Sequence, residues 1–529
     1  MTIEDATTEV TDGVAATVNP PERVLDLISE LCRSLDAEGI QWCHWKSNES
    51  LDRSASGEND LDLLVERSDV ERFHAVMRRL GFESARLPSW KEMPGVWHAY
   101  GLDPPTGSLV HIHAHRQLIV GDDMTKNYHL PIETAYLGSV VRSWPFMIPA
   151  AEYEFAVFLV RMVIKHCTWD SIVSGQAALT RSERREFADL LARVDQEQVW
   201  SIMERHLPFI PADLRRHLLR SVQPGASAWF RIRSARRLQR ALVGCSRRPR
   251  AVDTYLRLWR RGRTFAGRRF FGRPAERKRL GERGRVIALV GGDGAGKSTA
   301  VQDLTDWLGA EFVTAAVHMG KPPRSALSRV VKGLMTFAAS VKRSAVPSGT
   351  ALRRTIEASD SGSMNARTSA RLLWEVFTAR DRYRAYRRAR HAASRGSLVI
   401  CDRYPLPELK FMDGPVSGRM TDPSRWGPMV KRLADLEKRF YERIPYPDLL
   451  IVLRVPADVA VSRRSDERES FLRPRSEEVW QRDWSQTPAI VIDTDRPVAE
   501  VRLDIRSAVW TGLSSSGHRA AASTEEAAP

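Results

Sequence analysis

Hydrophobic residues in the second half of the chain fall into short apolar runs separated by segments with helical spacing. The run at 286–290 ends in glycines and is followed by the helical pattern of Val301, Leu304 and Leu308. Further strands are expected at 312–317, 397–401, 449–455 and 489–492, with a long helix at 370–394. Apolar strands that alternate with helices predict an α/β fold, a doubly wound parallel sheet covered on both faces.

In the first half, helical spacing at 24–35 precedes several expected strands. These strands lie at 40–45, at 60–65, where Asp60 and Asp62 share one face, and at 109–115. The segment 127–131 has turn and loop character. From 151 to about 219 the spacing is helical and is broken by prolines. An α+β domain followed by a helical region is therefore expected before the α/β domain.

The patterns divide the chain into six expected parts. They are a disordered tail at 1–22, an α+β domain at 23–150, a helical region at 151–230, a basic linker at 231–285, the α/β domain at 286–512 and a disordered tail at 513–529. Inside the α/β domain, an insertion between 321 and 365 has no predicted structure.

Composition indicates a soluble globular protein, with 43% hydrophobic and 28% charged residues. No signal peptide is visible at the N-terminus, so we expect a cytoplasmic location. The five cysteines are scattered, odd in number and without C-x-x-C spacing. This usage fits a reducing compartment and argues against a disulfide framework or a cysteine-based zinc site.

The net charge of +16 is concentrated in one segment. Residues 231–285 carry 20 Lys and Arg against three acids, so the rest of the chain is almost neutral. Two functional interpretations are a polyanion-binding surface, for example for nucleic acid, and a basic amphipathic helix on an anionic membrane. The alternative is a solvated linker with helical pieces that pack on neighbouring domains.

The strongest chemical signal is a phosphate-binding loop between the strand at 286–290 and the helix after it. Its G-x-x-x-x-G-K-[ST] pattern is formed by Gly291, Gly292, Asp293, Gly294, Ala295, Gly296, Lys297, Ser298 and Thr299. Glycines let backbone N–H groups converge on phosphates, Lys297 can reach the β and γ oxygens, and Ser298 can hold Mg²⁺. The sequence therefore predicts binding of ATP with Mg²⁺.

A second chemical signal is the strand at 397–401, which delivers Asp402 at its carboxyl end. Ligands of parallel sheets bind at this edge, so Asp402 can meet the nucleotide's Mg²⁺. The neighbouring Arg403 can clamp a second phosphate.

These motifs resemble the thymidylate kinase family of P-loop nucleotide kinases over 286 to about 510. The loop 291–299 is similar to the family's phosphate loop, and 396–404 is similar to its Asp-Arg-Tyr strand. The resemblance implies that Asp293 contacts the acceptor sugar and that Arg403 holds the acceptor phosphate. It also implies a mobile lid with the arginines Arg463, Arg464, Arg468, Arg473 and Arg475.

The loop carries Ala295 where one branch of the family places an arginine, so we expect the lid to supply the positive charge. Arg463 and Arg464 are the first candidates for stabilising the transferring group. The family reads thymine with a phenylalanine and an arginine one helical turn apart, but Phe377 and Arg382 are five residues apart here. A kinase is therefore expected, whereas dTMP as its acceptor is not fixed.

In the first half, the turn at Lys46 and Ser47 followed by Asp60 and Asp62 resembles the nucleotidyltransferase fold, whose Asp pair can share a divalent metal. That fold has a third carboxylate on a later strand, where this chain offers His111, His113 and His115 instead. The resemblance implies a second metal site at Asp60 and Asp62. A histidine metal site and an exposed polar strand face are both open for the three histidines.

The expected function is ATP- and Mg²⁺-dependent phosphoryl transfer to a phosphorylated small molecule, with a nucleoside monophosphate as the first choice. Lys297, Asp402, Arg463 and Arg464 are the expected catalytic residues. Two alternatives remain: an ATP-dependent switch or assembly factor with a degenerate acceptor site, and a nucleic-acid- or membrane-associated ATP-binding protein. A homodimer is also left open.

Overall fold

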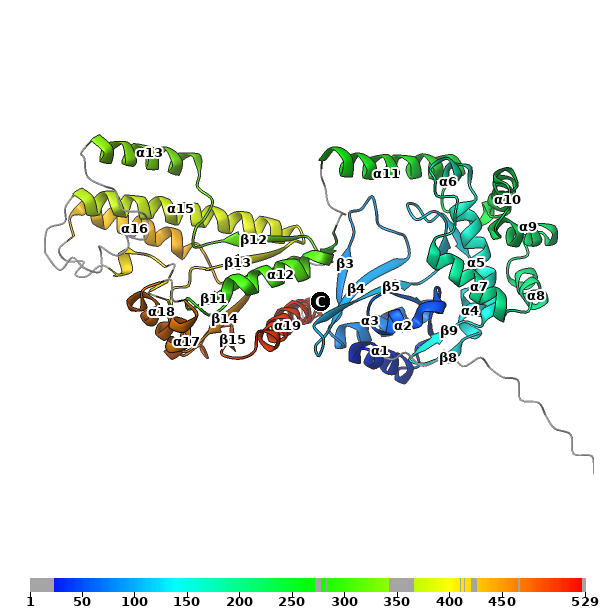
Figure 1. Cartoon of the computed structure of the whole chain (residues 1–529), viewed down its shortest axis with the longest axis horizontal. Helices are drawn as coiled ribbons and strands as arrows, with labels where there is room; N and C mark the ends of the chain where they lie inside the picture. The colour runs from blue at the N-terminus through cyan, green and yellow to red at the C-terminus, as the bar shows by residue number, and fades with distance from the viewer. Residues whose placement is uncertain are drawn as a thin grey trace, which may run out of the picture. The chain divides into compact units, whose positions relative to one another are not determined.

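A computed structural model describes residues 23–271, 277–281, 283–341, 366–409, 411–412, 414–419, 426–464 and 467–525. The chain forms two compact units (Figure 1). Unit 1 comprises Met1–Val76, Met93–Trp97 and Val110–Trp259, and unit 2 comprises Met77–Glu92, His98–Leu109 and Arg260–Pro529. The tail expected at 1–22 lies outside the described residues.

Unit 1 contains strands with alternating apolar and polar residues, as the sequence predicts. Strand β1 (Trp42–His44) follows helix α1 (Asp26–Ala37) and pairs antiparallel with β2 (Leu61–Val65). Strand β5 (Ser108–His115) pairs parallel with β2 and sets Asp62 opposite His113. Asp60 directly precedes β2.

The remainder of this part of unit 1 consists of short elements. They are α2 (Leu51–Ala55), β6 (Leu118–Val120), β7 (Tyr128–Leu130), α4 (Glu133–Gly138), β8 (Val141–Ser143) and β9 (Phe146–Ile148). The loop expected at 127–131 is wrong, because β7 pairs antiparallel with β6 and its Tyr128 and Leu130 are buried. Its three residues were too few for a periodic signal.

The helical region of unit 1 begins with α5 (Ala151–His166), which is buried on nearly all sides and belongs to the unit's largest apolar cluster. The helices around it are α6 (Trp169–Val173), α7 (Arg181–Arg193), α8 (Gln196–His206), α9 (Ala212–Val222) and α10 (Ala228–Ala241). Helix α8 ends and α9 begins around Pro208 and Pro211, as expected. Leu238 of α10 is fully buried in the same cluster, so the first part of the basic segment packs into unit 1.

Unit 2 contains the five-stranded parallel sheet that the sequence predicts, in the order β12-β13-β11-β14-β15. The strands are β11 (Val286–Gly291), β12 (Thr314–His318), β13 (Leu398–Asp402), β14 (Leu449–Arg454) and β15 (Ala489–Asp493). Each lies within two residues of its predicted position. Buried strands with long apolar runs are the pattern that sequence periodicity detects best.

Helices cover both faces of this sheet. Helices α12 (Lys297–Glu311) and α19 (Val498–Glu525) share one apolar cluster with alternate sheet residues, and α15 (Ala366–Ser394) and α18 (Glu469–Gln481) share another (Figure 1). Helices α13 (Ala326–Val341), α16 (Pro428–Glu442) and α17 (Ala457–Arg463) are further helices of unit 2. Helix α13 lies in the insertion that had no predicted structure.

The disordered tail expected from residue 513 is wrong over its described part. Helix α19 continues to Glu525, and Leu513 is buried with Val509 and Trp510 against the core of unit 2. An apolar stripe at 509, 510 and 513 anchors the helix into the residues that were assigned to the tail.

Unit 2 also contains three antiparallel strands that come from distant parts of the sequence. Strand β3 (Glu83–Arg86) pairs with β4 (Val96–Asp103) on one side and with β10 (Arg279–Leu280) on the other. Tyr100 is fully buried, and its ring lies 4.8 Å from that of Phe312. Unit 2 thus includes residues from well before 286.

Candidate functional site

The predicted phosphate-binding loop lies where β11 ends and α12 begins, at the carboxyl edge of the parallel sheet. Gly294 and Gly296 have φ angles of 82° and 78°, which favour glycine. A Cβ atom on Gly291 would lie 2.1 Å from the carbonyl oxygen of Leu453. The glycine pattern therefore follows from close packing as well as from loop conformation.

Lys297 begins α12 and points back into the loop. Its side chain is 6% exposed, and its Nζ donates a hydrogen bond to the Gly292 carbonyl oxygen over 2.5 Å. The same Nζ lies 3.7 Å from Asp293 Oδ1. The ammonium group is thus held beside the loop whose N–H groups can bind phosphates.

The Asp293 carboxylate is contacted by cationic side chains from separate elements. Its carboxylate accepts hydrogen bonds from Arg403 over 3.1 Å and from Arg475 of α18 over 2.8 Å, and it is 3% exposed. Burial alone would raise the pKa of Asp293, but Lys297, Arg403 and Arg475 lower it below its usual value. The structure thus brings three predicted site residues and one predicted lid residue together.

Asp402 lies at the end of β13, as the sequence predicts, and Ser298 lies in the first turn of α12 with an exposed side chain. The Oδ1 atom of Asp402 is buried and has no hydrogen-bond partner among the described residues. An unpartnered carboxylate oxygen beside a phosphate loop fits a hard cation, so Asp402 and Ser298 are suitable to hold Mg²⁺.

Arg403, directly after Asp402, has a φ angle of 55°. A non-glycine residue in the left-handed region stores backbone strain, and such residues cluster at functional sites. This conformation directs the guanidinium group toward Asp293.

The predicted lid arginines have different surroundings. Arg463 donates to the Thr494 carbonyl oxygen over 3.0 Å, Arg464 lies 2.5 Å from Glu467, and Arg473 contacts Asp458 over 2.8 Å. Arg468 precedes α18 as its N-cap residue. Among these five arginines, Arg475 contacts the predicted phosphate loop, through Asp293. The choice of Arg463 and Arg464 from the position of the arginine-rich stretch in the sequence could not detect that contact.

Phe377 and Arg382, the residues expected to read the acceptor base, lie on α15. Arg382 is 3% exposed, and its guanidinium group donates to the carbonyl oxygens of Met319 and Gly320 over 2.7 and 3.2 Å. It also contacts the Tyr441 hydroxyl group. Phe377 is half-buried. Arg382 thus ties α15 to the segment after β12.

In unit 1, the predicted aspartates and histidines gather on one face of β2 and β5. Asp60 Oδ1 lies 2.8 Å from His111 Nδ1, and Asp62 Oδ1 lies 3.4 Å from His113 Nδ1 and 3.5 Å from His115 Nε2. The parallel register of the two strands creates these contacts. The aspartate pair and the three histidines, which were interpreted separately from the sequence, form one cluster.

Lys46 is a residue of this cluster that the sequence placed only in a turn. Its Nζ lies 3.0 Å from Asp62 Oδ1. Burial would raise the pKa of Asp62, but Lys46, followed by the histidines, holds it well below its usual value. Burial also lowers the pKa of His115 to about 4, so this imidazole is neutral near pH 7.

The basic segment also contains α11 (Arg250–Phe271), in which the charged residues Asp253, Arg257 and Arg260 are buried while several apolar residues are exposed. Arg257, 2% exposed, contacts Asp170 over 2.8 Å and Asp253 over 2.9 Å. In the part of α11 that belongs to unit 1, four apolar residues are at least 43% exposed, namely Val252, Tyr255, Leu258 and Trp259. A row of apolar residues on the outer face of a helix indicates an interaction surface.

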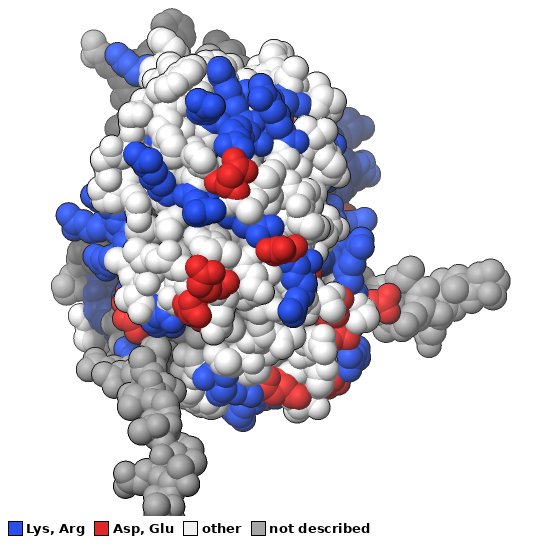
Figure 2. All heavy atoms as spheres, turned by 90° about the vertical axis from the view of Figure 1, so that its right-hand side faces the viewer, with Lys and Arg blue, Asp and Glu red and all other residues white. Residues whose placement is uncertain are grey.

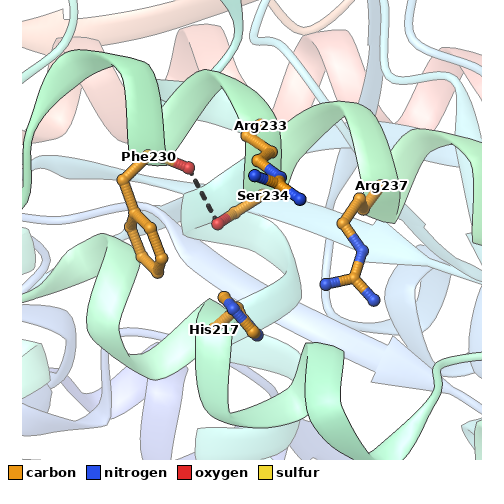
Figure 3. Close-up of a pocket in the computed structure, with 5 residues that line it drawn as sticks. All are labelled: His217, Phe230, Arg233, Ser234 and Arg237. Carbon is orange, nitrogen blue, oxygen red and sulfur yellow. Dashed lines mark hydrogen bonds between the residues drawn. The ribbon is translucent and has the colours of Figure 1, made fainter.

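Basic side chains gather on the side of unit 1 where α8, α9 and α10 lie (Figure 2). A small pocket of about 170 Å³ lies there, lined by His217 of α9 and by Phe230, Arg233, Ser234 and Arg237 of α10 (Figure 3). Arg237 is paired with Asp213 at 2.5 Å, and Arg233 is exposed. The pocket is large enough for a single anionic group.

Among the described helices, none combines the length and apolar character that crossing a membrane requires.

No protein-family model matches the chain. Over 236 residues it is 28% identical to the uncharacterized ATP-binding protein YghR of Escherichia coli K12, covering 42% of this chain and 86% of YghR. Over 243 residues it is 29% identical to the thymidylate kinase of Chromohalobacter salexigens, covering 44% of this chain and 98% of that kinase.

Among solved structures, the thymidylate kinase of Candida albicans aligns with 44% of this chain and 93% of its own, at 16% identity and a TM-score of 0.28. Over less than half of its length, the chain is therefore similar in sequence to bacterial thymidylate kinases and ATP-binding proteins.

Proposed function

We propose that the protein transfers a phosphoryl group from ATP to a phosphorylated small molecule. The observation that carries the proposal is the position of Asp293, a buried carboxylate in a phosphate-binding loop that is contacted by Arg403 from one element and by Arg475 from another. Cations that converge beside a phosphate loop suit two phosphate-bearing ligands. Similarity to thymidylate kinases and to ATP-binding proteins supports this function.

Each loop residue has a role in this proposal. Backbone N–H groups of the glycine loop bind the donor phosphates, and Lys297 neutralises the β and γ oxygens. Mg²⁺, held by Ser298 and Asp402, supplies further charge neutralisation when it is bound. Arg475, with the other lid arginines, stabilises charge on the transferring group.

The acceptor is proposed to be a nucleoside monophosphate, without a commitment to its base. Arg403 would clamp its phosphate and Asp293 would accept a hydrogen bond from its sugar hydroxyl group, because these two side chains already lie 3.1 Å apart beside the loop. Arg382 is engaged with two backbone carbonyl oxygens, so we do not assign it to thymine.

Acceptor-stimulated ADP release tests the proposal. We expect the full-length protein with MgATP to release ADP faster in the presence of at least one nucleoside monophosphate or sugar phosphate in a panel. Arg403→Ala should reduce this stimulation by roughly 100-fold, because positioning of the acceptor phosphate is lost. Arg387→Ala, an exposed arginine on α15, serves as the matched control.

Stimulation by no phosphorylated small molecule would contradict phosphoryl transfer and favour an ATP-dependent switch. An equal loss in Arg387→Ala would contradict the specific role of Arg403. Thymidine monophosphate belongs in the panel, since a preference for it would show that Phe377 and Arg382 can still read thymine.

A second candidate function, docking of unit 1 on an anionic lipid surface, rests on a different observation. The outward face of α11 is apolar at Val252, Tyr255 and Trp259, while Arg257 is turned inward and ion-paired. Exposed cations suit both nucleic acid and an anionic lipid surface, whereas outward apolar residues beside basic ones are a feature of an interfacial helix. The exposed aromatic residues therefore favour lipid.

A further inference from the structure

The aspartates and histidines of unit 1 have an arrangement that the sequence expectations did not contain. Asp62 in β2 and Asp60, directly before β2, lie on one face of the strand. His111 and His113 lie on the same side of the neighbouring strand β5. The ring centroids of His111 and His113 are 4.2 Å apart, and these two residues offer ring nitrogens within 4.8 Å of each other. Imidazole and carboxylate donors are thus concentrated on one strand pair.

Asp60 is the carboxylate that both histidines can reach. Its Oδ1 lies 2.8 Å from His111 Nδ1, and its Oδ2 lies 3.7 Å from His113 Nε2. Donor atoms on one metal ion with bonds of ~2.1 Å are separated by about 3.0–3.5 Å, and the two distances from Asp60 to the histidine nitrogens lie within a few tenths of an ångström of that range. Asp60 is 49% exposed, which gives an ion access from solvent.

Asp62 has a different relation to the same histidine. It contacts the opposite ring nitrogen, with its Oδ1 3.4 Å from His113 Nδ1, and Lys46 Nζ and His115 Nε2 lie 3.0 and 3.5 Å from the same Oδ1 atom. A carboxylate that accepts a hydrogen bond from one ring nitrogen fixes the tautomer and directs the other nitrogen to a metal. Asp62 therefore orients His113 Nε2 toward Asp60.

We propose that Asp60, His111 and His113 bind a divalent transition-metal ion such as Zn²⁺, with Asp62 as a positioning residue for His113. Two imidazoles and one carboxylate favour borderline ions of the first transition row over Mg²⁺, which prefers oxygen ligands. Three protein ligands leave coordination positions open for water or a substrate atom. This arrangement differs from an aspartate pair that shares Mg²⁺.

The test is metal titration of the full-length protein in excess Mg²⁺, so that the phosphate-loop site is saturated. Co²⁺ provides a visible absorption spectrum, and Zn²⁺ is added as its competitor. We expect one Co²⁺ per chain to be displaced by Zn²⁺ but not by further Mg²⁺. His113→Ala and Asp60→Asn should abolish binding, whereas Asp62→Asn should weaken it by roughly 10–100-fold.

His129→Ala is the matched control, because His129 also lies 2.7 Å from an acid, Glu133, in unit 1. Its Co²⁺ affinity should equal that of the parent. Folding is checked by circular dichroism and by the melting temperature in a chelator. A folded His113→Ala protein whose melting temperature no longer rises with Zn²⁺ would support the site.

Several outcomes would overturn the proposal. They are the absence of Co²⁺ binding, displacement of Co²⁺ by Mg²⁺ at equal concentration, and unchanged binding in folded His113→Ala or Asp60→Asn. Equal and complete losses in Asp60→Asn and Asp62→Asn would instead assign both carboxylates as ligands and contradict the positioning role of Asp62.

Discussion

At the scale of single residues, Asp293 organises the phosphate-loop site through charge. Its carboxylate is 3% exposed and is compensated by Lys297, Arg403 and Arg475. An incoming phosphate would offer the same cations a second partner, so its binding is expected to redistribute hydrogen bonds among groups already in place. Preorganised cations of this kind stabilise charge without large rearrangement.

Lys297 gives the most direct residue-scale prediction. Lys297→Ala should lower ATP turnover by roughly 100-fold or more, because it removes the positive charge nearest the β and γ phosphates. The variant also loses the hydrogen bond to the Gly292 carbonyl oxygen and a cation beside the buried Asp293, so we expect it to be destabilised by about 1–3 kcal/mol. Steady-state ADP release and thermal unfolding measure the two effects, and turnover at the parent's rate would contradict the assignment of the loop.

Glu154 gives a prediction about pH. It is 3% exposed on α5, and burial, together with the charge of Glu186, raises its pKa to about 8. Its pKa in the unfolded chain is about 4.3, so the folded state retains a proton that the unfolded state loses. Stability should therefore fall as the pH rises from about 5 to about 8.

Glu154→Gln removes this proton linkage while keeping the shape of the side chain. As the pH rises from about 5.5 to about 8.5, the free energy of unfolding of the variant should increase relative to that of the parent, as measured by urea denaturation. Glu197→Gln, at an exposed position on α8, is the control and should follow the parent. A constant difference between Glu154→Gln and the parent across this range would show that Glu154 is ionised in the folded state.

At the scale of elements, sequence periodicity predicted the features that depend on residues adjacent in the sequence. All five parallel strands of unit 2 and the loop glycines were found this way, because their apolar runs and glycine spacing are contiguous in sequence. The contact of Arg475 with Asp293 spans 182 positions, and the two-residue strand β10 has too few residues for a pattern. Such features depend on tertiary packing and could not be predicted from local sequence.

The basic segment illustrates the same limit and gives the element-scale prediction. Its charge left both an anionic partner and a solvated linker open, and only the structure shows which α11 side chains face outward. We expect the protein to sediment with vesicles that contain phosphatidylserine and not with neutral phosphatidylcholine vesicles. Replacing Tyr255 and Trp259 together by Ser should reduce binding several-fold, because outward aromatic residues anchor interfacial helices.

Lys438→Ser on α16, an exposed basic residue outside the segment, is the control for this experiment. Retention on DNA that survives the Tyr255 and Trp259 replacement, without vesicle binding, would assign the surface to nucleic acid instead.

At the scale of the whole molecule, the two units interleave along the chain. Residues 77–92 and 98–109 belong to unit 2, although most of its sequence follows residue 260. Tyr100 is fully buried there, and its hydroxyl group contacts Glu311 and Lys278. A boundary drawn at 286 would therefore remove part of the P-loop unit's core.

Tyr100→Ala tests this interleaving. It should destabilise unit 2 by about 3–5 kcal/mol, the usual cost of truncating a buried aromatic residue. The unfolding transition that shifts upward with MgATP should therefore move to lower temperature. Tyr255→Ala, at a position 67% exposed, should leave that transition in place. An unchanged ATP-sensitive transition in Tyr100→Ala would show that residues 98–109 do not support the P-loop unit.

Because the two units interleave along the chain, the parts of unit 2 are synthesised at widely separated times. Trp510 Nε1 donates to the Gly81 carbonyl oxygen across 429 positions. During synthesis the segment containing Gly81 and Tyr100 leaves the ribosome long before its partners, which at 5–20 residues per second arrive after roughly 20–90 s. An early strand pair must therefore wait for the last helix, so this chain should depend on chaperones more than a protein whose domains are completed one after another.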